Sequence, residues 1–232
     1  YFANEMLKRH GRSVDGLRVS VAGSGNVARY AVEKAMALGA RVVTVSDSSG
    51  TVYDEAGFTP EKLALLMEVK NHLYGRVDDY AKRVGATFLP GQRPWAIPVD
   101  VALPCATQNE LDGEDAKTLV QNGVRCVVEG ANMPCTLEAI TLFEHSGVSY
   151  APGKASNAGG VATSGLEMSQ NAMRLSWSRE EVDQRLQAIM GNIHDACVRY
   201  GQRADGSISY VNGANIAGFV KVADAMLAQG VI

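Results

Sequence analysis

Residues 19–28 read V-S-V-A-G-S-G-N-V-A and carry more information than any other stretch of this chain. Their apolar start predicts a buried strand, the spacing Gly23-x-Gly25-x-x-Ala28 follows it, and residues 30–38 then have a helical pattern. In such a turn the first glycine permits a sharp bend and the second lets the backbone approach a pyrophosphate, while the helix start presents unpaired N–H groups to the phosphates. The pattern therefore predicts a dinucleotide-binding turn. An ordinary strand–turn–helix that uses its glycines for geometry alone is the alternative.

Strand and helix patterns alternate over the first two-thirds of the chain. Short connections join them, which predicts a doubly wound, Rossmann-type α/β fold with a mostly parallel sheet and helices on both faces. The expected strands are 17–22, 41–46, 87–89, 99–103, 124–128 and 148–150, with a hairpin-like stretch at 50–54. The expected helices are 1–10, one opened by Thr59 and Pro60, 77–84, 113–121 and 136–145.

The pattern changes after residue 156, where long helices are expected at 161–177, 180–200 and about 215–228. Ser178 and Glu181 have the spacing of a capping box at the start of the second of these helices. We therefore expect a dinucleotide-binding core over residues 1–155 and a C-terminal helical extension over residues 156–232. Because the chain starts without Met and already looks helical there, the first helix is expected to lead in from a preceding domain.

Composition describes a globular protein and narrows its partners. The 232 residues are 46% hydrophobic and 20% charged, and no apolar run approaches the length of a membrane span. A net charge of −3 argues against nucleic acid or a membrane as partner. The four cysteines have no CxxC spacing, so we expect reduced core residues, no metal site and a cytoplasmic location.

An acidic residue, Asp47, ends the second expected strand. A carboxylate at this place usually accepts hydrogen bonds from the adenosine ribose and favours NAD, because it repels a 2′-phosphate. Hydroxyl and basic side chains nevertheless gather in the sequence around it and after the next helix: Ser46, Ser48, Lys70, His72 and Arg76. The basic residues are equally compatible with a solvated helix end, so the residues alone leave NAD and NADP open.

Two polar, turn-forming stretches, residues 103–109 and 128–134, follow later strands. Ligands lie at the carboxyl ends of parallel strands, and Thr107, Gln108 and Asn132 can donate and accept hydrogen bonds to a ribose or an amide. Capping of the following helices is the alternative.

A third stretch, residues 151–171, crowds small residues around a helix start, which indicates close approach to that backbone. The Asn157 side chain both donates and accepts and could satisfy a carboxamide, and Ser164 lies further along the helix. Close helix packing is the alternative here.

Taken together, these stretches resemble the cofactor domain of the hexameric glutamate dehydrogenase family. The resemblance extends from Tyr1 to Ile232, including a closing helix with the sequence N-G-A-N-I-A-G-F at 212–219. It rests on four motifs in order: Gly23-Ser-Gly-Asn-Val-Ala28, Leu103-Pro-Cys-Ala-Thr-Gln-Asn109, Glu129-Gly-Ala-Asn-Met-Pro134 and Asn157-Ala-Gly-Gly-Val-Ala-Thr-Ser-Gly-Leu-Glu-Met-Ser-Gln-Asn171.

The resemblance implies a cofactor role for each matching residue. Asn26 would contact the diphosphate, within a turn that also includes Gly23, Ser24, Gly25 and Val27. The ribose and the nicotinamide would be lined by Ala106, Thr107, Gln108 and Asn132, and Asn157 would hold the carboxamide. The Ser46-Asp47-Ser48 sequence resembles the NADP-preferring branch, in which Lys70 and Arg76 would bind the 2′-phosphate. NADP is thus the expected cofactor, and NAD is the alternative.

The resemblance also implies a substrate. Ser164 would bind the side-chain carboxylate of glutamate, with Val161 beside it. The expected reaction is the reversible oxidative deamination of L-glutamate to 2-oxoglutarate and ammonium, in a homohexamer. A dehydrogenase of branched-chain or aromatic amino acids is a rival, although an apolar residue would then be expected at Ser164. A non-catalytic dinucleotide-sensing module is another.

The chain departs from the family in one respect. The family's catalytic lysine and aspartate belong to an N-terminal substrate domain, so no catalytic residue is expected in this segment. Lys154 is expected to make a structural or cofactor contact. The chain alone should therefore bind cofactor without turnover.

Overall fold

The computed structural model describes residues 1–230, which are organised around a seven-stranded sheet. Its strands are β1 Arg18–Ala22, β2 Arg41–Asp47, β3 Gly50–Tyr53, β4 Thr87–Pro90, β5 Val101–Pro104, β6 Cys126–Val128 and β7 Ser149–Ala151, in the spatial order β4-β3-β2-β1-β5-β6-β7. The five strands from β2 to β7 in that order pair in parallel, whereas β3 is antiparallel to both β2 and β4. The mostly parallel sheet is confirmed, and the hairpin-like stretch is the strand β3.

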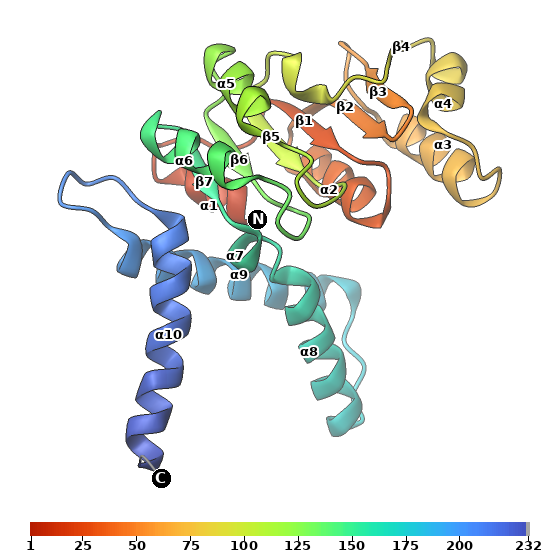
Figure 1. The fold of residues 1–232 in the computed structure, drawn as a ribbon. Coiled ribbons are helices and arrows are strands. Elements are labelled where there is room, and N and C mark those ends of the chain that lie inside the picture. Colours follow the sequence, from red (N-terminus) through yellow and green to blue (C-terminus); the bar gives the residue numbers. More distant parts are fainter. Residues whose placement is uncertain (231–232) are drawn as a thin grey trace.

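Helices cover both faces of this sheet (Figure 1). They are α1 Phe2–Lys8, α2 Asn26–Ala37, α3 Pro60–Asn71, α4 Val77–Val84, the short 3-10 helix η1 Pro94–Ala96, α5 Gly113–Gln121 and α6 Leu137–His145. One buried cluster packs α1 to α4 against the sheet and includes Leu66 and Tyr80. A second cluster packs η1, α5 and α6 against the other face and includes Trp95 and Phe143. The two cores confirm the doubly wound α/β fold.

The order of the strands places a switch point beside β1. The chain leaves β1 toward β2 on one side, and the later strand β5 pairs with β1 on the other side. Connections that diverge in this way leave a crevice at the carboxyl ends of the two central strands, where ligands of such sheets bind. The turn after β1 lies at this crevice.

The remaining helices are α7 Gly153–Ser156, α8 Gly159–Met173, α9 Arg179–Gly201 and α10 Tyr210–Gln229. Figure 1 shows α8 and α10 projecting from the sheet layer as two separate legs, with α9 between their bases. Residues 231–232 of the expected helical extension lie outside the described residues.

Local signals set the ends of the two projecting helices. Helix α8 ends at Met173, earlier than expected, because Arg174 adopts a left-handed conformation (φ 55°) that a helix cannot continue through. Helix α10 begins earlier than expected because the Ser209 hydroxyl accepts a hydrogen bond from the Asn212 amide, 3.2 Å away, and caps it. The capping box of Ser178 and Glu181 at the start of α9 is confirmed.

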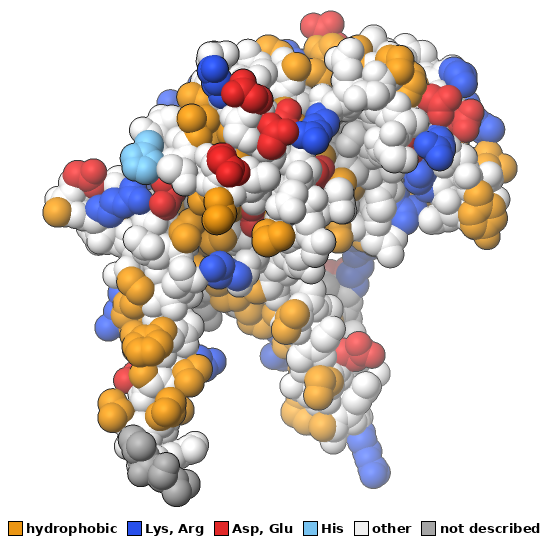
Figure 2. Space-filling model, in the orientation of Figure 1, with side chains coloured by type: hydrophobic (Ala, Val, Ile, Leu, Met, Phe, Trp, Pro, Cys, Tyr) orange, Lys and Arg blue, Asp and Glu red, His pale blue; other side chains and the backbone are white. Residues whose placement is uncertain are grey.

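Large apolar side chains are exposed on both legs, as Figure 2 shows. They are Val161, Met168 and Met173 on α8, and Ile216, Phe219, Val222, Met226 and Leu227 on α10. The four cysteines are free and buried, as expected. Within residues 1–230, no helix combines the length and the hydropathy that crossing a membrane requires.

Candidate functional site

The two glycines of the turn between β1 and α2 differ in what they do. Gly23 has a φ of +94°, and a Cβ added to it would lie 3.0 Å from the Ala106 Cα, so the protein's own packing requires glycine here. At Gly25 the φ is an ordinary −77°, and an added Cβ would meet nothing within 4 Å. The missing side chain of Gly25 therefore leaves open space directly at the start of α2.

Helix α2 begins at this open space without a side-chain cap among the described residues. Its first residues, Asn26 and Val27, are exposed, and its first turn contains no acidic residue. The first N–H groups of a helix lack partners inside the helix and carry its positive dipole end. The geometry can thus accept an anionic group close to the Gly25 backbone.

Ser46 holds the glycine turn in place. Its buried hydroxyl accepts a hydrogen bond from the Gly23 amide at 2.8 Å, and its own amide donates to the Gly23 carbonyl at 3.1 Å. The neighbouring Ser24 is also buried. The sequence predicted both Ser46 and Ser24 as cofactor contacts. In the structure, Ser46 forms its hydrogen bonds with the glycine turn itself.

Arg29 belongs to the same site and was missed in the sequence. Its side chain is almost fully buried and donates to the Asn26 side-chain oxygen and, at 2.7 Å, to the side-chain oxygen of Asn71 at the end of α3. These two bonds connect the start of α2 to the end of α3 and orient Asn26. A positive side chain in the first turn of the helix after a glycine turn is the signal that could have found it.

Asp47, at the end of β2, has hydrogen bonds to both carboxylate oxygens. Oδ1 accepts from the amide and the hydroxyl of Ser49, and Oδ2 accepts from the Val77 amide at 3.1 Å and faces the Lys70 ammonium at 3.4 Å. Burial favours the neutral acid, but the bonds from Ser49 and Val77 and the charge of Lys70 together lower the pKa of Asp47. The carboxylate is therefore ionised at neutral pH, with partners already supplied by the protein.

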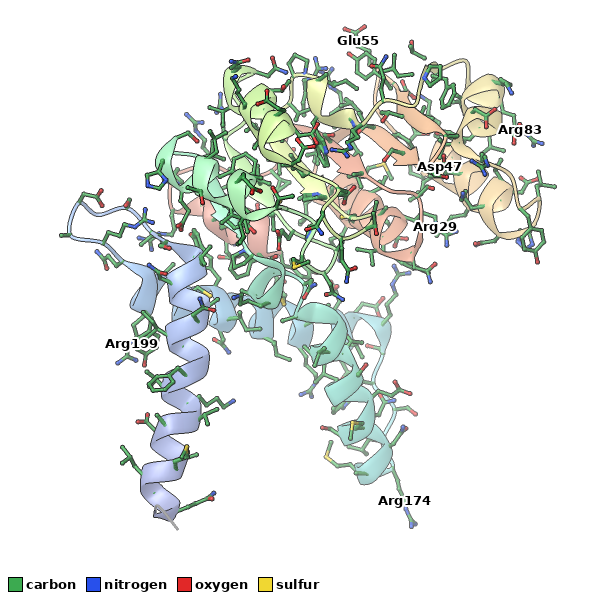
Figure 3. All side chains as sticks on the ribbon, in the orientation of Figure 1. Arg29, Asp47, Glu55, Arg83, Arg174 and Arg199 are labelled. Carbon is green, nitrogen blue, oxygen red and sulfur yellow. The ribbon has the colours of Figure 1, made fainter. Side chains whose placement is uncertain are left out.

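Of the basic residues that the sequence grouped with Asp47, Lys70 and Arg76 lie near it. The Lys70 side chain is largely buried against it. The guanidinium of Arg76, just before α4, donates to the Ser48 hydroxyl at 3.4 Å, and both side chains are exposed. Figure 3 shows Asp47 and Arg29 at the edge of the sheet between α2 and the α3–α4 pair. His72 is exposed beyond the end of α3.

The loops after β5 and β6 run together. The Asn109 amide donates to the Met133 carbonyl and the Leu111 amide to the Pro134 carbonyl, each at 3.0 Å. These bonds bring the exposed 106–108 segment close to the exposed Asn132. The 106–108 segment consists of Ala106, Thr107 and Gln108.

Asn157 and Asn132 form a pair across two loops. The Asn157 amide nitrogen donates to the Asn132 side-chain oxygen at 2.7 Å and to the Ala131 carbonyl at 3.2 Å. The pair keeps an acceptor on Asn157 and a donor on Asn132 for further bonds. A carboxamide, which offers one acceptor and two donors, matches this remaining set.

Glu129, also missed in the sequence, fixes these loops from inside. It is 3% exposed and accepts hydrogen bonds from the Cys135 amide, from the Tyr150 hydroxyl at 2.6 Å and from the Gly153 amide at 2.6 Å. Burial, with the nearby Glu129 charge, raises the pKa of Tyr150, so its hydroxyl stays protonated and donates. Glu129 therefore joins the loop that carries Asn132 to the loop that leads to Asn157.

The expected substrate residues lie on the neighbouring helix α8. Ser164 is exposed there, and Val161 is 79% exposed one turn earlier. Lys154 donates to the Asn215 side chain of α10 at 2.7 Å, which is a structural contact. Among residues 1–230 there is no group of three or more side chains suited to hold a metal ion.

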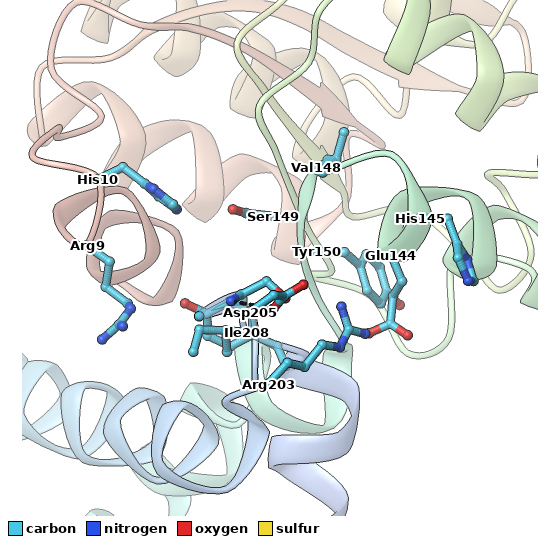
Figure 4. Close-up of a pocket in the computed structure, with 14 residues that line it drawn as sticks. Arg9, His10, Glu144, His145, Val148, Ser149, Tyr150, Arg203, Asp205 and Ile208 are labelled. Carbon is cyan, nitrogen blue, oxygen red and sulfur yellow. Dashed lines mark hydrogen bonds and ion pairs between the residues drawn. The ribbon is translucent and has the colours of Figure 1, made fainter.

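A separate pocket of about 550 Å³ lies at the amino end of β7 (Figure 4). Charged side chains of both signs line it: Arg9, Glu144, Arg203 and Asp205. Arg203 is paired with Glu144 at 3.3 Å. Of the residues discussed above, Tyr150 alone also lines this pocket, so the candidate site is the crevice at the carboxyl ends of the strands.

Comparison with known proteins gives consistent matches. A family model described as glutamate/leucine/phenylalanine/valine dehydrogenase matches residues 1–230. The NADP-specific glutamate dehydrogenase of Salmonella typhi is 68% identical over 232 residues, which are 100% of this chain and 52% of that protein. The NAD-specific glutamate dehydrogenase of Bacteroides fragilis (strain YCH46) is 56% identical over 233 residues, with the same two shares.

The crystal structure of Plasmodium falciparum glutamate dehydrogenase matches with a TM-score of 0.96 at 46% identity. The match covers 100% of this chain and 50% of that chain. The chain thus spans about half the length of the curated relatives it matches.

Proposed function

Because the chain belongs to the glutamate/leucine/phenylalanine/valine dehydrogenase family, we propose that it is the cofactor-binding part of an NADP-linked glutamate dehydrogenase. The whole protein would catalyse the reversible oxidative deamination of L-glutamate to 2-oxoglutarate and ammonium. We propose that residues 1–155 form the dinucleotide-binding core and that residues 156–232 pack toward an N-terminal substrate domain. We also propose that the whole protein forms a homohexamer and is located in the cytoplasm.

The open space at Gly25 carries the cofactor proposal. The space lies at the switch point of the sheet, beside the start of α2, which no side chain of residues 1–230 caps. No neighbouring atom would contact a Cβ at Gly25, so the packing of the protein does not require glycine there. A dinucleotide diphosphate fits the space and the dipole there. Gly25, Asn26 and Val27 would then contact it, with Gly23 and Ser24 forming the turn behind.

The surroundings of Asp47 support NADP over NAD. A free carboxylate here would accept ribose hydroxyls and repel a 2′-phosphate. The Asp47 oxygens, however, already accept hydrogen bonds from Ser49 and Val77, and Lys70 offsets their charge. Lys70 and Arg76 would bind the 2′-phosphate, with Ser48 adding a hydroxyl donor. Family membership does not decide this point, because relatives of both cofactor types are similar to the chain.

The other end of the cofactor would lie at the Asn132–Asn157 pair. The acceptor on Asn157 and the donor on Asn132 would bind its carboxamide, and the 106–108 segment would line the adjoining ribose. When bound, the nicotinamide supplies hydride acceptance and donation. The residues of this chain hold and orient it.

The substrate would approach from α8. The Ser164 hydroxyl is exposed on the helix whose start adjoins Asn157 and would donate to the side-chain carboxylate of glutamate, with Val161 as an apolar wall. We assign no general acid or base to this chain and propose that the catalytic lysine and aspartate belong to the rest of the protein.

The proposal is tested by the substrate kinetics of the full-length protein. We expect turnover of glutamate with NADP and little turnover of leucine or phenylalanine. A Ser164→Ala change should raise the KM for glutamate about tenfold, since one hydrogen bond to a charged group is lost. Ser169→Ala is the matched control, because that hydroxyl bonds to the Gly165 carbonyl within α8. Preference for leucine or an unchanged glutamate KM in Ser164→Ala would contradict the substrate assignment.

A further inference from the structure

The Glu110 side chain folds back onto the loop that follows β5. Its carboxylate accepts a hydrogen bond from the Ala106 amide at 2.9 Å. The adjacent Thr107 amide also favours the ionised carboxylate. The Glu110 backbone is fixed independently, because the indole N–H of the buried Trp95 donates to the Glu110 carbonyl at 3.3 Å. The carboxylate thus connects a rigid anchor to the exposed 106–108 segment.

We propose that Glu110 is a positioning residue that holds the 106–108 segment in its cofactor-binding shape only while its carboxylate is ionised, so that protonation of this carboxylate weakens cofactor binding. The inference rests on the proposed function, because it takes Ala106, Thr107 and Gln108 as cofactor contacts. It adds a pH-sensitive residue that touches neither cofactor nor substrate.

The electrostatic surroundings place this titration near neutrality. Burial is the main cause that raises the pKa of Glu110 to about 7, and the charge of Asp115 adds to the increase. The backbone amides of Ala106 and Thr107 and the charge of Arg93 lower the pKa and oppose this shift in part. The Arg93 guanidinium, which lowers the pKa of Glu110, also forms ion pairs with Asp112 and Asp115.

Two thiols also respond to the charge of Glu110. Burial raises the pKa of Cys105 and of Cys135, and the charge of Glu110 contributes to both increases. Both thiols therefore stay neutral across the range in which Glu110 changes its charge.

The direction of the effect follows from hydrogen bonding. An ionised carboxylate only accepts hydrogen bonds and matches the Ala106 amide donor, whereas a protonated one carries a donor of its own and accepts more weakly. Protonation therefore loosens the segment. If the protonated form binds cofactor poorly, a single group with a pKa of about 7 weakens affinity up to about tenfold between about pH 8 and about pH 6.

The test is a fluorescence titration of this chain with NADPH at about pH 6, 7 and 8. The 2′-phosphate titrates near pH 6 by itself, as phosphate monoesters do, so the comparison is made between variants with the same ligand. In Glu110→Gln the amide oxygen still accepts hydrogen bonds but does not titrate. We expect the pH dependence of Kd to be several-fold smaller in this variant than in the wild type. Glu114→Gln removes a nearby, 89% exposed carboxylate and should keep the wild-type profile.

A measurement on the unmodified chain makes the test independent of the variant. The amide NMR signals of Ala106 and of the adjacent Thr107 should shift together with a midpoint at about pH 7, as the carboxylate beside them is titrated. Amide signals that stay constant over this range, or equal NADPH profiles in wild type and Glu110→Gln, would overturn the role of Glu110. Absence of NADPH binding at every pH would instead overturn the proposed function, and the inference with it.

Discussion

The Asp47 carboxylate and the Lys70 ammonium lie 3.4 Å apart, at the ends of β2 and α3. Their side chains are only 15% and 23% exposed, so the pair is partly shielded from water. An acidic residue at this position usually accepts hydrogen bonds from the ribose hydroxyls of NAD, and Asp47 is not free to do so in the same way. Both Asp47 oxygens already have hydrogen-bond partners, and in the proposed function the cation held beside Asp47 binds the 2′-phosphate.

Replacement of Lys70 by Gln should therefore weaken binding of NADPH and not of NADH. Loss of one charge-assisted bond to phosphate corresponds to about a tenfold higher Kd for NADPH, with the Kd for NADH changed less than about twofold. Lys82→Gln is the control, because that lysine lies on α4 with a 73% exposed side chain and pairs with Asp78. Equal losses for both cofactors in Lys70→Gln would remove Lys70 from the phosphate site.

The two glycines of the turn should respond differently to alanine. Gly25→Ala adds a methyl group in open space at an ordinary backbone angle, so the free energy of unfolding should change by less than about 1 kcal/mol. Affinity for NADPH should nevertheless decrease at least about tenfold, because the methyl group occupies the space assigned to the diphosphate.

Gly23→Ala should instead destabilise the fold by about 2 kcal/mol or more, because of its φ of +94° and its contact with Ala106. Urea unfolding and NADPH titration of both variants separate the two effects. Unchanged NADPH affinity in a folded Gly25→Ala variant would argue against a diphosphate at this turn.

Glu129→Gln tests the buried connection behind the Asn132–Asn157 pair. One side-chain oxygen of Glu129 accepts from the Gly153 amide and the other from the Cys135 amide and the Tyr150 hydroxyl. Either orientation of a glutamine places its NH₂ group against a backbone N–H, so we expect a loss of about 2 to 4 kcal/mol in the free energy of unfolding. The exposed Glu138→Gln on α6 is a suitable control, and a loss no larger than that of the control would show that Glu129 is dispensable.

His194 should make stability depend on pH. It is 3% exposed, packs edge-on against Phe2 and hydrogen-bonds to the Tyr210 hydroxyl at 3.1 Å. Burial lowers its pKa, although the charges of Asp195 and Glu5 oppose the shift. Above pH 6.5, the usual histidine value, neither the folded nor the unfolded state holds this proton.

As pH falls below that value, the unfolded state takes up the proton first. Stability should then decrease by up to about 1.4 kcal/mol per pH unit, until the folded pKa is reached. Urea midpoints at about pH 7.5 and about pH 5.5 measure the change. His194→Gln should show a smaller decrease than the wild type and than His145→Gln, which replaces an exposed histidine. The same decrease in all three proteins would assign the effect to other groups.

The sequence was sufficient for features with a local signal. The glycine turn, the alternation of strands and helices, and the capped starts of α3 and α9 follow from residues close together in the chain. The pairing of β3 with β4 had no such signal, because β4 follows two helices later in the chain.

The site residues that were missed act through distant partners. Arg29 bonds to Asn71 and Glu129 to Tyr150 and Gly153, and these contacts exist only after the strands and helices are assembled. For the same reason, the sequence could place Asp47 at the end of a strand but could not show that the Val77 amide donates to its carboxylate.

The most direct test of the central claim is the affinity of this chain for NADPH and NADH, measured by fluorescence titration under the same conditions. We expect NADPH to bind at least about tenfold more tightly than NADH, because in the proposed function Lys70 and Arg76 bind the 2′-phosphate. Equal affinities would contradict the cofactor assignment, and binding of neither nucleotide would contradict the dinucleotide site itself.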